Sequence, residues 1–345
     1  MKHSWVEVSR SRLQENVAAI RNHLSPSTRI IAVVKANAYG HGVKEVSRCL
    51  VDLGIGDFIV ATLEEAVELR QYVPSGEILV LDGWLKGEEK TFRKHDLTAS
   101  LFDRRTPPDD MKVEVKIDTG MTRLGIPWKE AKALVAGLTS QVRGLFSHFA
   151  CSEQDPDFTR LQLKRFQEAT YGLPYRRHIS NSAGLQFPEA QLDAVRLGLL
   201  LYGISPCPSL DFVRPILRWK TRTLTIQRVP QGQSIGYCGT FITQRESLVG
   251  VLPVGYADGY NRLWSNRGQV RIRGQLVPVL GRVSMDLISV DLTDISDPAT
   301  GEEVVLLEDS PDSPIAATAW AKTLGTIPYE VLTSIGNRVE RVVGK

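Results

Sequence analysis

The sequence predicts an α/β protein: a (β/α)8 barrel followed by a mostly β C-terminal domain. Eight short, apolar, β-branched runs recur in the first two thirds of the chain, mostly separated by segments with helical periodicity. After about residue 217, strand-like runs follow one another without intervening helices. The alternative for the first part is a doubly wound open sheet. No GxGxxG motif opens the first of these helices, which counts against the dinucleotide-binding version of that sheet.

The expected barrel strands are Ile30–Val34, Phe58–Ala61, Ile78–Leu81, Leu97–Leu101, Val113–Ile117, Val142–Ser147, Arg177–Ser180 and Ala194–Leu197. A helix over Leu13–Leu24 is expected before the first of them. Thr62 with Glu65 three residues later predicts a capping box at the start of another helix. Alternating strands and helices imply parallel strands, and eight units in about 200 residues fit a closed barrel better than an open sheet.

One helix of the outer ring is expected to be missing. Only residues 103–112 connect the fourth and fifth strands, and Pro107 and Pro108 remove two backbone donors there. Ten extended residues span roughly 33 Å, enough to return along a short strand. Four side chains would lose their usual cover: Leu97, Leu101, Val113 and Val115. Either a neighbouring helix leans over them or an apolar groove stays open.

The C-terminal domain is expected to contain the strands Trp219–Val229, Ser247–Val254, Gln269–Ile272, Leu276–Val283, Leu287–Leu292 and Glu303–Leu307. A late helix is expected near Ile315–Leu324. These elements predict a barrel domain over residues 9–217 and a β-rich domain over residues 218–345, which a strand over residues 3–8 could join. The proline-rich stretch Ser205–Ser209 is the expected hinge between them.

The composition excludes several function classes. Lys and Arg number 42 against 39 Asp and Glu, which gives a net charge of +3. A charge this close to zero gives no electrostatic indication that the protein binds nucleic acid or an anionic membrane. The longest apolar stretch, Leu197–Ile204, is far shorter than the ~20 residues that span a bilayer. The four cysteines form no CxxC pair, so neither a metal site nor a disulfide framework is expected. Free thiols and the absence of a signal-peptide pattern at the N-terminus predict a cytoplasmic protein.

The segment Ile31–Gly42 carries the sharpest chemical signal. It places Lys35 at the C-terminal end of the first expected strand, which in a barrel is the active-site face. An amine among apolar neighbours is desolvated, so its pKa falls and it can form a Schiff base with a carbonyl compound. The alternative is a lysine at the end of a strand that reaches to water.

Seven further motifs follow this segment in order and cover nearly the whole chain: Val115–Gly125, Ser147–Ala150, Asn181–Ser182, Arg196–Gly203, Gly255–Gly259, Gly281–Asp286 and Ile327–Val331. Together, in this order, they resemble the alanine racemase family. The resemblance implies a barrel with a β domain, pyridoxal phosphate as cofactor, and racemisation of a small amino acid.

By this resemblance, Lys35 holds the cofactor and acts as one of two bases. Racemisation needs a base on each face of a planar carbanion, because a single base would have to cross that plane. The second base would be Tyr237, although Gly236 and Cys238 depart from the family's Ser-Tyr-Gly context. A phenol with a pKa near 10 is a poor base at pH 7 unless cations stabilise its phenolate. Taken alone, Tyr237 could equally be a half-buried strand residue.

In the family, a histidine and an arginine stabilise that phenolate, and they match His148 and Arg196. Arg196 would face the pyridine nitrogen of the cofactor. A guanidinium essentially never gives up its proton, so it hydrogen-bonds this nitrogen without protonating it, which weakens the ring as an electron sink and disfavours transamination. Taken alone, His148 could be a core imidazole and Arg196 a salt-bridged residue at the end of a strand.

The resemblance also assigns the remaining binding residues. The cofactor phosphate would be bound by Tyr39, Ser182, Gly198, Leu199 and Tyr329. The substrate would be bound by Arg123, the N–H of Met285, and Tyr256. Lys116 matches a lysine that the family often carbamylates to position the arginine; a plain lysine paired with an acid is the alternative.

In the family the β domain of one subunit completes the site of the other, so the resemblance implies a homodimer with shared active sites. The resemblance also implies that the enzyme supplies D-alanine for peptidoglycan. The alternatives are a racemase for serine or of broad range, and a non-catalytic carrier of pyridoxal phosphate on a similar barrel. The bulky ring of Tyr329 disfavours a serine specialist, and the segment after residue 217 disfavours the carrier.

Overall fold

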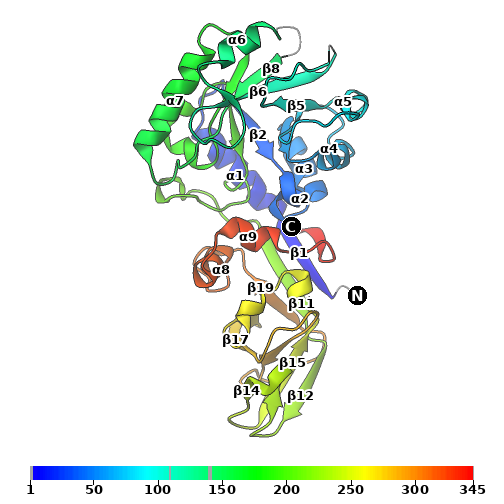
Figure 1. Cartoon of the computed structure of the whole chain (residues 1–345). Helices are drawn as coiled ribbons and strands as arrows, with labels where there is room; N and C mark the ends of the chain where they lie inside the picture. Colours follow the sequence, from blue (N-terminus) through cyan, green and yellow to red (C-terminus); the bar gives the residue numbers. More distant parts are fainter. Residues whose placement is uncertain (1–2, 109, 139–141, 345) are drawn as a thin grey trace. The chain divides into compact units, whose positions relative to one another are not determined.

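The computed structural model describes residues 3–108, 110–138 and 142–344. The chain divides into two compact units, which Figure 1 traces in sequence colours. The barrel unit is Ser11–Val213. The β unit combines Met1–Arg10 with Arg214–Lys345, so the first residues of the chain belong with its last third.

The barrel unit contains a closed ring of eight parallel strands. Its order is β2, β3, β4, β5, β6, β8, β9 and β10, and the pairing of β10 with β2 completes the ring. The strands are β2 Arg29–Val33, β3 Asp57–Val60, β4 Ile78–Val80, β5 Thr98–Leu101, β6 Lys112–Asp118, β8 Val142–Phe146, β9 Arg176–His178 and β10 Ala194–Leu197. A two-residue strand, β7 Ile126–Pro127, pairs with the end of β6. The prediction of a closed barrel is confirmed, and the open sheet is excluded.

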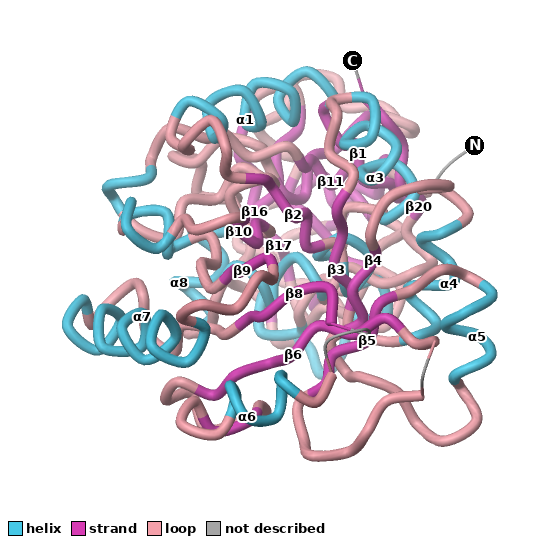
Figure 2. Tube along the Cα trace, turned by 90° about the horizontal axis from the view of Figure 1, so that it is seen from above, coloured by secondary structure: helices cyan, strands magenta, loops and turns pink. Residues whose placement is uncertain are grey.

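Helices surround these strands (Figure 2). They are α1 Arg10–Asn22, α3 Val43–Asp52, α4 Leu63–Arg70, α5 Glu89–Lys94, α6 Ala131–Ala136 and α7 Pro156–Thr170. The short segment labelled α2, Lys35–Tyr39, is a turn of mostly left-handed residues rather than a regular helix. Short 3-10 turns follow at Ala183–Gln186, Pro188–Ala190 and Pro208–Leu210. The predicted capping box is confirmed, because Thr62 accepts the Glu65 N–H while the Glu65 carboxylate accepts the Thr62 N–H.

The predicted gap in the outer ring is also confirmed. Residues 103–108, 110 and 111, between β5 and β6, contain no helical residue; residue 109 lies outside the described part. The guanidinium of Arg105 instead lies 5.1 Å from the ring centre of Trp84 and 5.9 Å from that of Phe102. The four side chains expected to lose their cover are all buried: Leu97, Leu101, Val113 and Val115. No apolar groove is therefore open at these side chains.

The β unit is built on a nine-stranded sheet of order β12-β15-β18-β17-β16-β19-β11-β1-β20. Its strands are β1 Ser4–Ser9, β11 Leu217–Arg222, β12 Thr225–Val229, β15 Ser247–Leu252, β16 Gln269–Ile272, β17 Gln275–Leu280, β18 Ile288–Asp291, β19 Glu303–Leu307 and β20 Glu340–Gly344. A separate hairpin pairs β13 Ser234–Ile235 with β14 Phe241–Ile242. The helices are α8 Ala317–Leu324 and α9 Pro328–Thr333, with 3-10 turns at Tyr237–Gly239, Tyr256–Asp258 and Arg262–Trp264.

One expected strand of this unit is wrong in detail. The run Trp219–Val229 is two strands, because β11 pairs with β1 and β19 whereas β12 pairs with β15. The chain turns between them at Thr223, whose N–H donates to the Glu302 carbonyl. No glycine or proline interrupts residues 219–229, so the sequence gave no turn signal at the change of partner.

Candidate active site

Lys35 follows β2 at the C-terminal end of the barrel, and the next four residues form a left-handed turn. They have φ values of 50–53° and are Ala36, Asn37, Ala38 and Tyr39. Left-handed geometry costs roughly 1–2 kcal/mol for each residue other than glycine, so neighbouring groups must stabilise this turn. The Ala36 N–H donates to the Glu65 carboxylate at 2.7 Å, and the Val43 N–H donates to the Asn37 side chain at 2.7 Å.

Lys35 is half-buried, and burial lowers the pKa of its amine below the ordinary value. The charge of Arg123 lowers this pKa further, whereas the carboxylates of Glu65 and Asp82 act in the opposite direction. A larger share of the amine is therefore unprotonated at neutral pH than for an exposed lysine. The unprotonated amine is the form that attacks a carbonyl carbon.

Arg196 on β10 is buried, and its two terminal nitrogens bind four acceptors. Nη1 donates to Nδ1 of His178 at 2.8 Å, and Nη2 donates to Nδ1 of His148 at 2.9 Å. Nη2 also donates to the carbonyl oxygens of Ser147 at 2.6 Å and Ile179 at 2.8 Å. Burial lowers the pKa of Arg196 to about 10, so the guanidinium is still charged at neutral pH. Nε has no acceptor among the described residues and is left to donate to a further group.

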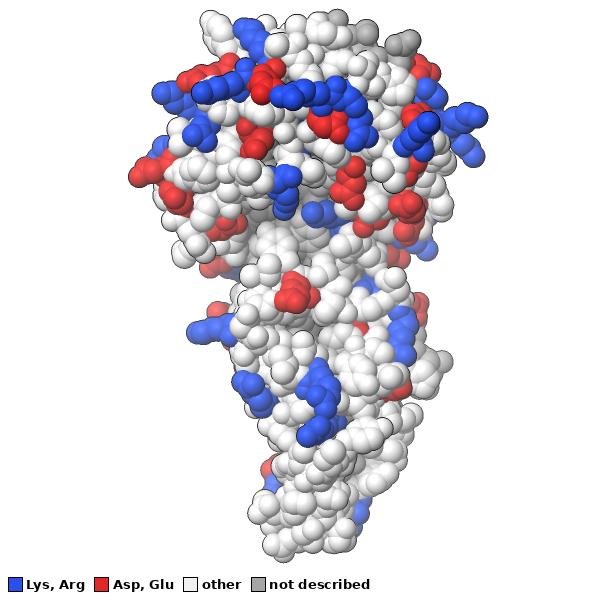
Figure 3. All heavy atoms as spheres, in the orientation of Figure 1, with Lys and Arg blue, Asp and Glu red and all other residues white. Residues whose placement is uncertain are grey.

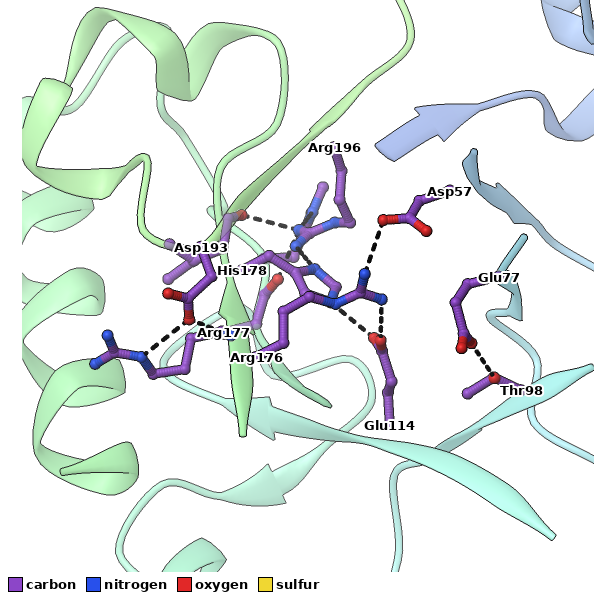
Figure 4. A network of polar contacts seen from close by, with 12 residues as sticks. Asp57, Glu77, Thr98, Glu114, Arg176, Arg177, His178, Asp193 and Arg196 are labelled. Atoms are coloured by element: carbon purple, nitrogen blue, oxygen red, sulfur yellow. Dashed lines mark hydrogen bonds and ion pairs between the residues drawn. The ribbon is translucent and has the colours of Figure 1, made fainter. Parts of the chain in front are cut away.

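A chain of buried polar contacts continues from Arg196 across the barrel interior (Figure 4). Nε2 of His178 donates to Glu114 at 2.7 Å, and Arg176 donates to the other oxygen of Glu114 at 2.8 Å. Arg176 also donates to Asp57 at 2.8 Å. Four barrel strands, β3, β6, β9 and β10, supply these five side chains. The orientation of Arg196 is therefore set by residues far from it in the sequence.

The protonation states of this network follow from its charges. Burial would raise the pKa of Glu114, but its interactions with His178 and Arg176 outweigh this effect and lower the pKa to about 2. Burial lowers the pKa of His178, and the charges of Arg196 and Arg176 lower it further, although Glu114 opposes them. The sequence analysis missed His178 and Glu114. A signal was present, because Glu114 is a charged residue between Val113 and Val115 in the fifth expected barrel strand, where a charge is buried only if it is paired.

His148 and Lys116 lie in the same electropositive environment. Burial lowers the pKa of His148 well below its ordinary value, and the charges of Arg196, Lys116 and Arg123 add to this effect. Burial also lowers the pKa of Lys116 to about 8, helped by the charges of Arg123, Arg196 and Lys35. Within the described residues, Lys116 has no carboxylate partner in an ion pair, although the charge of Asp118 acts on its amine.

A second feature of the barrel unit is a group of donors suited to an anion. The hydroxyl of Ser182 accepts the N–H groups of Gly198 and Leu200 at 3.4 and 3.3 Å, so these groups lie close together. The N–H of Leu199 has no acceptor in the described part of the chain. The ring of Tyr39 packs so closely on Gly198 that an added Cβ would lie 2.8 Å from it. Backbone N–H groups converging in this way bind phosphate in many proteins.

The other predicted site residues belong to the β unit. Tyr237 is exposed on the turn after β13, where Gly236 and Cys238 both have positive φ. Tyr256 and Met285 are both exposed. Their loops are adjacent, since the Tyr256 N–H donates to the Ser284 carbonyl and the Ala257 N–H donates to the Met285 carbonyl. The Met285 N–H has no acceptor among the described residues.

Tyr329 lies on α9 and is half-buried. The end of α9 packs on the turn that follows Tyr256, since an added Cβ on Gly259 would lie 2.2 Å from the Ser334 carbonyl oxygen. The structure thus gathers nine predicted residues in the barrel unit and four in the β unit: Lys35, Tyr39, Lys116, Arg123, His148, Ser182, Arg196, Gly198 and Leu199 in the first, and Tyr237, Tyr256, Met285 and Tyr329 in the second.

Three wider observations concern other kinds of site. Within residues 3–108, 110–138 and 142–344, no group of three or more His, Cys, Asp or Glu is arranged to hold a metal ion. In the same ranges no helix has both the length and the apolar composition needed to cross a membrane. On the face of the barrel unit drawn in Figure 3, Lys and Arg side chains are interspersed with Asp and Glu side chains.

Comparisons with known proteins agree on one family. Residues 8–206 match the alanine racemase N-terminal domain, and residues 216–343 match the alanine racemase C-terminal domain. An alanine racemase of Halothermothrix orenii is 40% identical over 365 residues, which cover 98% of this chain and 96% of the relative.

Solved structures agree as well. An alanine racemase of Clostridium difficile 630 has a TM-score of 0.92 at 31% identity, covering 100% of this chain and 96% of its own. The alanine racemase of Bartonella henselae, solved with covalently bound pyridoxal phosphate, has a TM-score of 0.87 at 28% identity and covers 100% of both chains. Three features of the barrel unit fit this cofactor. The Lys35 amine has a lowered pKa, and the Nε of Arg196 has no acceptor among the described residues. The N–H groups of Gly198, Leu199 and Leu200 are suited to its phosphate. The chain belongs to the alanine racemase family of pyridoxal-phosphate-dependent isomerases, which act on small amino acids.

Proposed function

We propose that this chain interconverts L-alanine and D-alanine by a two-base mechanism. The observation that carries the proposal is the pairing of β2 with β10, because Lys35 follows the end of β2 and the buried Arg196 lies on β10. Pyridoxal phosphate, when bound, supplies a conjugated ring that withdraws electrons from the substrate Cα. The protein supplies the bases, the orientation and the charges around that atom.

Lys35 would hold the cofactor covalently. Its phosphate would be bound by the hydroxyls of Tyr39, Ser182 and Tyr329 and the N–H groups of Gly198 and Leu199. Arg196 would donate through Nε to the ring nitrogen, because its other two nitrogens are occupied. A guanidinium keeps its proton, so Arg196 would hydrogen-bond the ring nitrogen without protonating it, and the ring would be a weaker electron sink. This supports racemisation over transamination.

Lys35 and Tyr237 would be the two bases, one on each face of the substrate. His148 accepts from Arg196 through Nδ1 and therefore has its Nε2–H available to donate to the phenolate of Tyr237. Tyr237 would take the proton of L-alanine, and Lys35 that of D-alanine.

The substrate carboxylate would be bound by Arg123 and the Met285 N–H, with Tyr256 beside them. Lys116 would carry a carbamate that positions Arg123. The physical support is the environment of Lys116. Burial and the positive charges of Arg123, Arg196 and Lys35 lower its pKa to about 8 against the opposing charge of Asp118, so its amine is more readily neutral than that of an exposed lysine. Conversion to an anionic carbamate would relieve the repulsion among these positive charges.

We further propose a homodimer in which Tyr237, Tyr256 and Met285 of one subunit complete the site of the other. All three side chains are exposed in the single chain. Residues that contribute to the site of a partner subunit are expected to be exposed when that partner is absent.

We also propose a cytoplasmic enzyme that supplies D-alanine for peptidoglycan. The four cysteines form no disulfide, in keeping with a reducing compartment.

A non-catalytic carrier of pyridoxal phosphate is disfavoured by the β unit, since residues 216–343 match the alanine racemase C-terminal domain. The remaining alternative is a broader racemase that also accepts serine. A chiral assay of the purified holoenzyme with alanine, serine and larger amino acids separates these functions. Turnover of alanine at least tenfold above the others is expected; no turnover of alanine would contradict the proposal.

The two bases can be tested separately. Borohydride reduction should fix the cofactor on the peptide containing Lys35. Tyr237→Phe should slow Cα–H exchange of L-alanine far more than that of D-alanine, and equal losses would argue against bases on opposite faces. Mixing inactive Lys35→Ala with Tyr237→Phe subunits should restore part of the activity, because a hybrid dimer contains one intact site. No recovery after demonstrated subunit exchange would refute the shared site.

A further inference from the structure

Glu65 connects two parts of the barrel unit through one carboxylate. Its Oε2 accepts the N–H groups of Ala61 at 2.8 Å and Thr62 at 3.4 Å, which caps α4. Its Oε1 accepts the N–H of Ala36 at 2.7 Å, across a separation of 29 residues. Only the first of these tasks is part of helix capping. The second joins the start of α4 to the residue directly after Lys35.

This second contact acts on a strained segment. Ala36 is the first of four consecutive left-handed residues, with a φ of 50°. The turn's own hydrogen bonds run from Ala38 to Val34 and from Gly40 to Ala36, so they use the carbonyl of Ala36 but not its N–H. Glu65 supplies the acceptor for that N–H. The direction in which Lys35 leaves β2 is therefore determined in part by a side chain on another helix.

The same carboxylate also contributes charge at the amine. Lys35 is faced by Arg123, which lowers the pKa of its amine, and by Glu65 and Asp82, which raise it. Lys116 lies within electrostatic range as well. Burial makes the largest contribution and lowers the pKa. Removing the charge of Glu65 leaves Asp82 as the one carboxylate to oppose burial and Arg123.

We propose that Glu65 is the positioning residue of Lys35, holding the left-handed turn that begins directly after it through the Ala36 N–H. The inference rests on the proposed function for its catalytic meaning, because it concerns the base of that reaction. Glu65 does not touch the substrate. It acts through Lys35, and its effect belongs to kcat rather than to the binding of alanine, for which Arg123 and Met285 are responsible.

The test uses three variants of the full chain. Glu65→Gln keeps the shape but removes the charge and one acceptor. Glu65→Asp keeps the charge but cannot reach both Ala36 and Thr62. Thr62→Ala is the matched control, because it removes the other half of the same capping box without touching Ala36.

The first readout is the titration of Lys35 in cofactor-free protein, measured by competitive labelling with acetic anhydride at a series of pH values. Glu65→Gln should shift the labelling of Lys35 to lower pH, whereas Glu65→Asp and Thr62→Ala should retain the parent profile. In the holoenzyme both Glu65 variants should lower kcat about tenfold or more at an unchanged KM, since small misplacements of a catalytic group have large effects. Thr62→Ala should keep its kcat although it loses a similar amount of thermal stability.

An unshifted Lys35 profile in Glu65→Gln, or an equal fall of kcat in Thr62→Ala, would overturn the proposal. If Glu65→Gln does not fold, the comparison of kcat between Glu65→Asp and Thr62→Ala decides the question alone. The labelling result does not depend on the reaction. A shifted profile in Glu65→Gln, together with a parent protein that does not racemise alanine, would refute the proposed function and leave the role of Glu65 intact.

Discussion

Nη2 of Arg196 donates a hydrogen bond to Nδ1 of His148 at 2.9 Å. A guanidinium cannot accept a hydrogen bond, so Nδ1 of His148 is the unprotonated nitrogen and the proton lies on Nε2. The same reasoning holds for His178, whose Nδ1 accepts from Arg196 while Nε2 donates to Glu114. Both imidazoles are therefore neutral, in agreement with their lowered pKa values.

We expect His148 and His178 to be neutral at pH values where an ordinary histidine is half protonated, because burial lowers the pKa of both. Nitrogen-15 spectra of histidine-labelled protein, assigned with His148→Gln and His178→Gln variants, should show Nε2-protonated rings that do not titrate near pH 6.5. Since the folded-state pKa lies below that of the unfolded chain, the unfolded chain binds more protons below about pH 6.5. These two residues therefore make stability fall as the pH falls. A ring that titrates at pH 6.5 in the folded protein would contradict this assignment.

Lys116 should react with carbon dioxide. Its pKa of about 8 leaves a neutral fraction that grows as the pH rises through that value, so a carbamate should become more populated over roughly pH 6.5 to 8.5. Carbon-13 NMR after equilibration with labelled bicarbonate should show one slowly exchanging carbamate signal that Lys116→Met abolishes. Lys112→Met is the control, because Lys112 lies on the same strand but is paired with Asp96 at 2.5 Å. Retention of the signal in Lys116→Met would disprove the assignment.

Gly198→Ala should weaken cofactor binding. The added Cβ would lie 2.8–2.9 Å from the ring of Tyr39, so that ring or the backbone must move away from the phosphate-binding N–H groups. A loss of affinity for pyridoxal phosphate of about tenfold, or ~1.4 kcal/mol, is expected in a fluorescence titration. Gly56→Ala is the control, because an added Cβ there meets nothing within 4 Å. Equal affinity for pyridoxal phosphate in the two variants would show that the N–H groups around Gly198 do not bind the cofactor phosphate.

Arg105 should stabilise the connection that lacks a helix. Its guanidinium lies over Trp84 and Phe102, and Nη1 donates to the Trp84 carbonyl at 3.0 Å. Arg105→Ala should lower the free energy of unfolding by about 1–2 kcal/mol, the sum of a cation–π contact and a hydrogen bond. Arg104→Ala, which removes an exposed ion pair with Glu130, should have no measurable effect. Urea unfolding compares the two, and equal effects would mean that Arg105 contributes no more than its neighbour.

Local features of this chain were predictable because they depend on near neighbours. The capping box of Thr62 and Glu65 needs only a spacing of three residues, and the helix-free connection follows from two adjacent prolines. The eight barrel strands follow from short β-branched runs between helical segments. The split of the run after Trp219 was not predictable, since it depends on which strand each half pairs with.

The sequence by itself determined the order of the barrel strands, the family and the identity of the candidate bases, because these are written in local patterns and ordered motifs. Tertiary structure alone decided that Glu65 reaches Ala36 and that Glu114, His178 and Arg196 form one network. Their separations of 29, 64 and 18 residues carry no local signal. Such contacts are set by strand register and barrel closure, which bring side chains together only after the whole ring has formed.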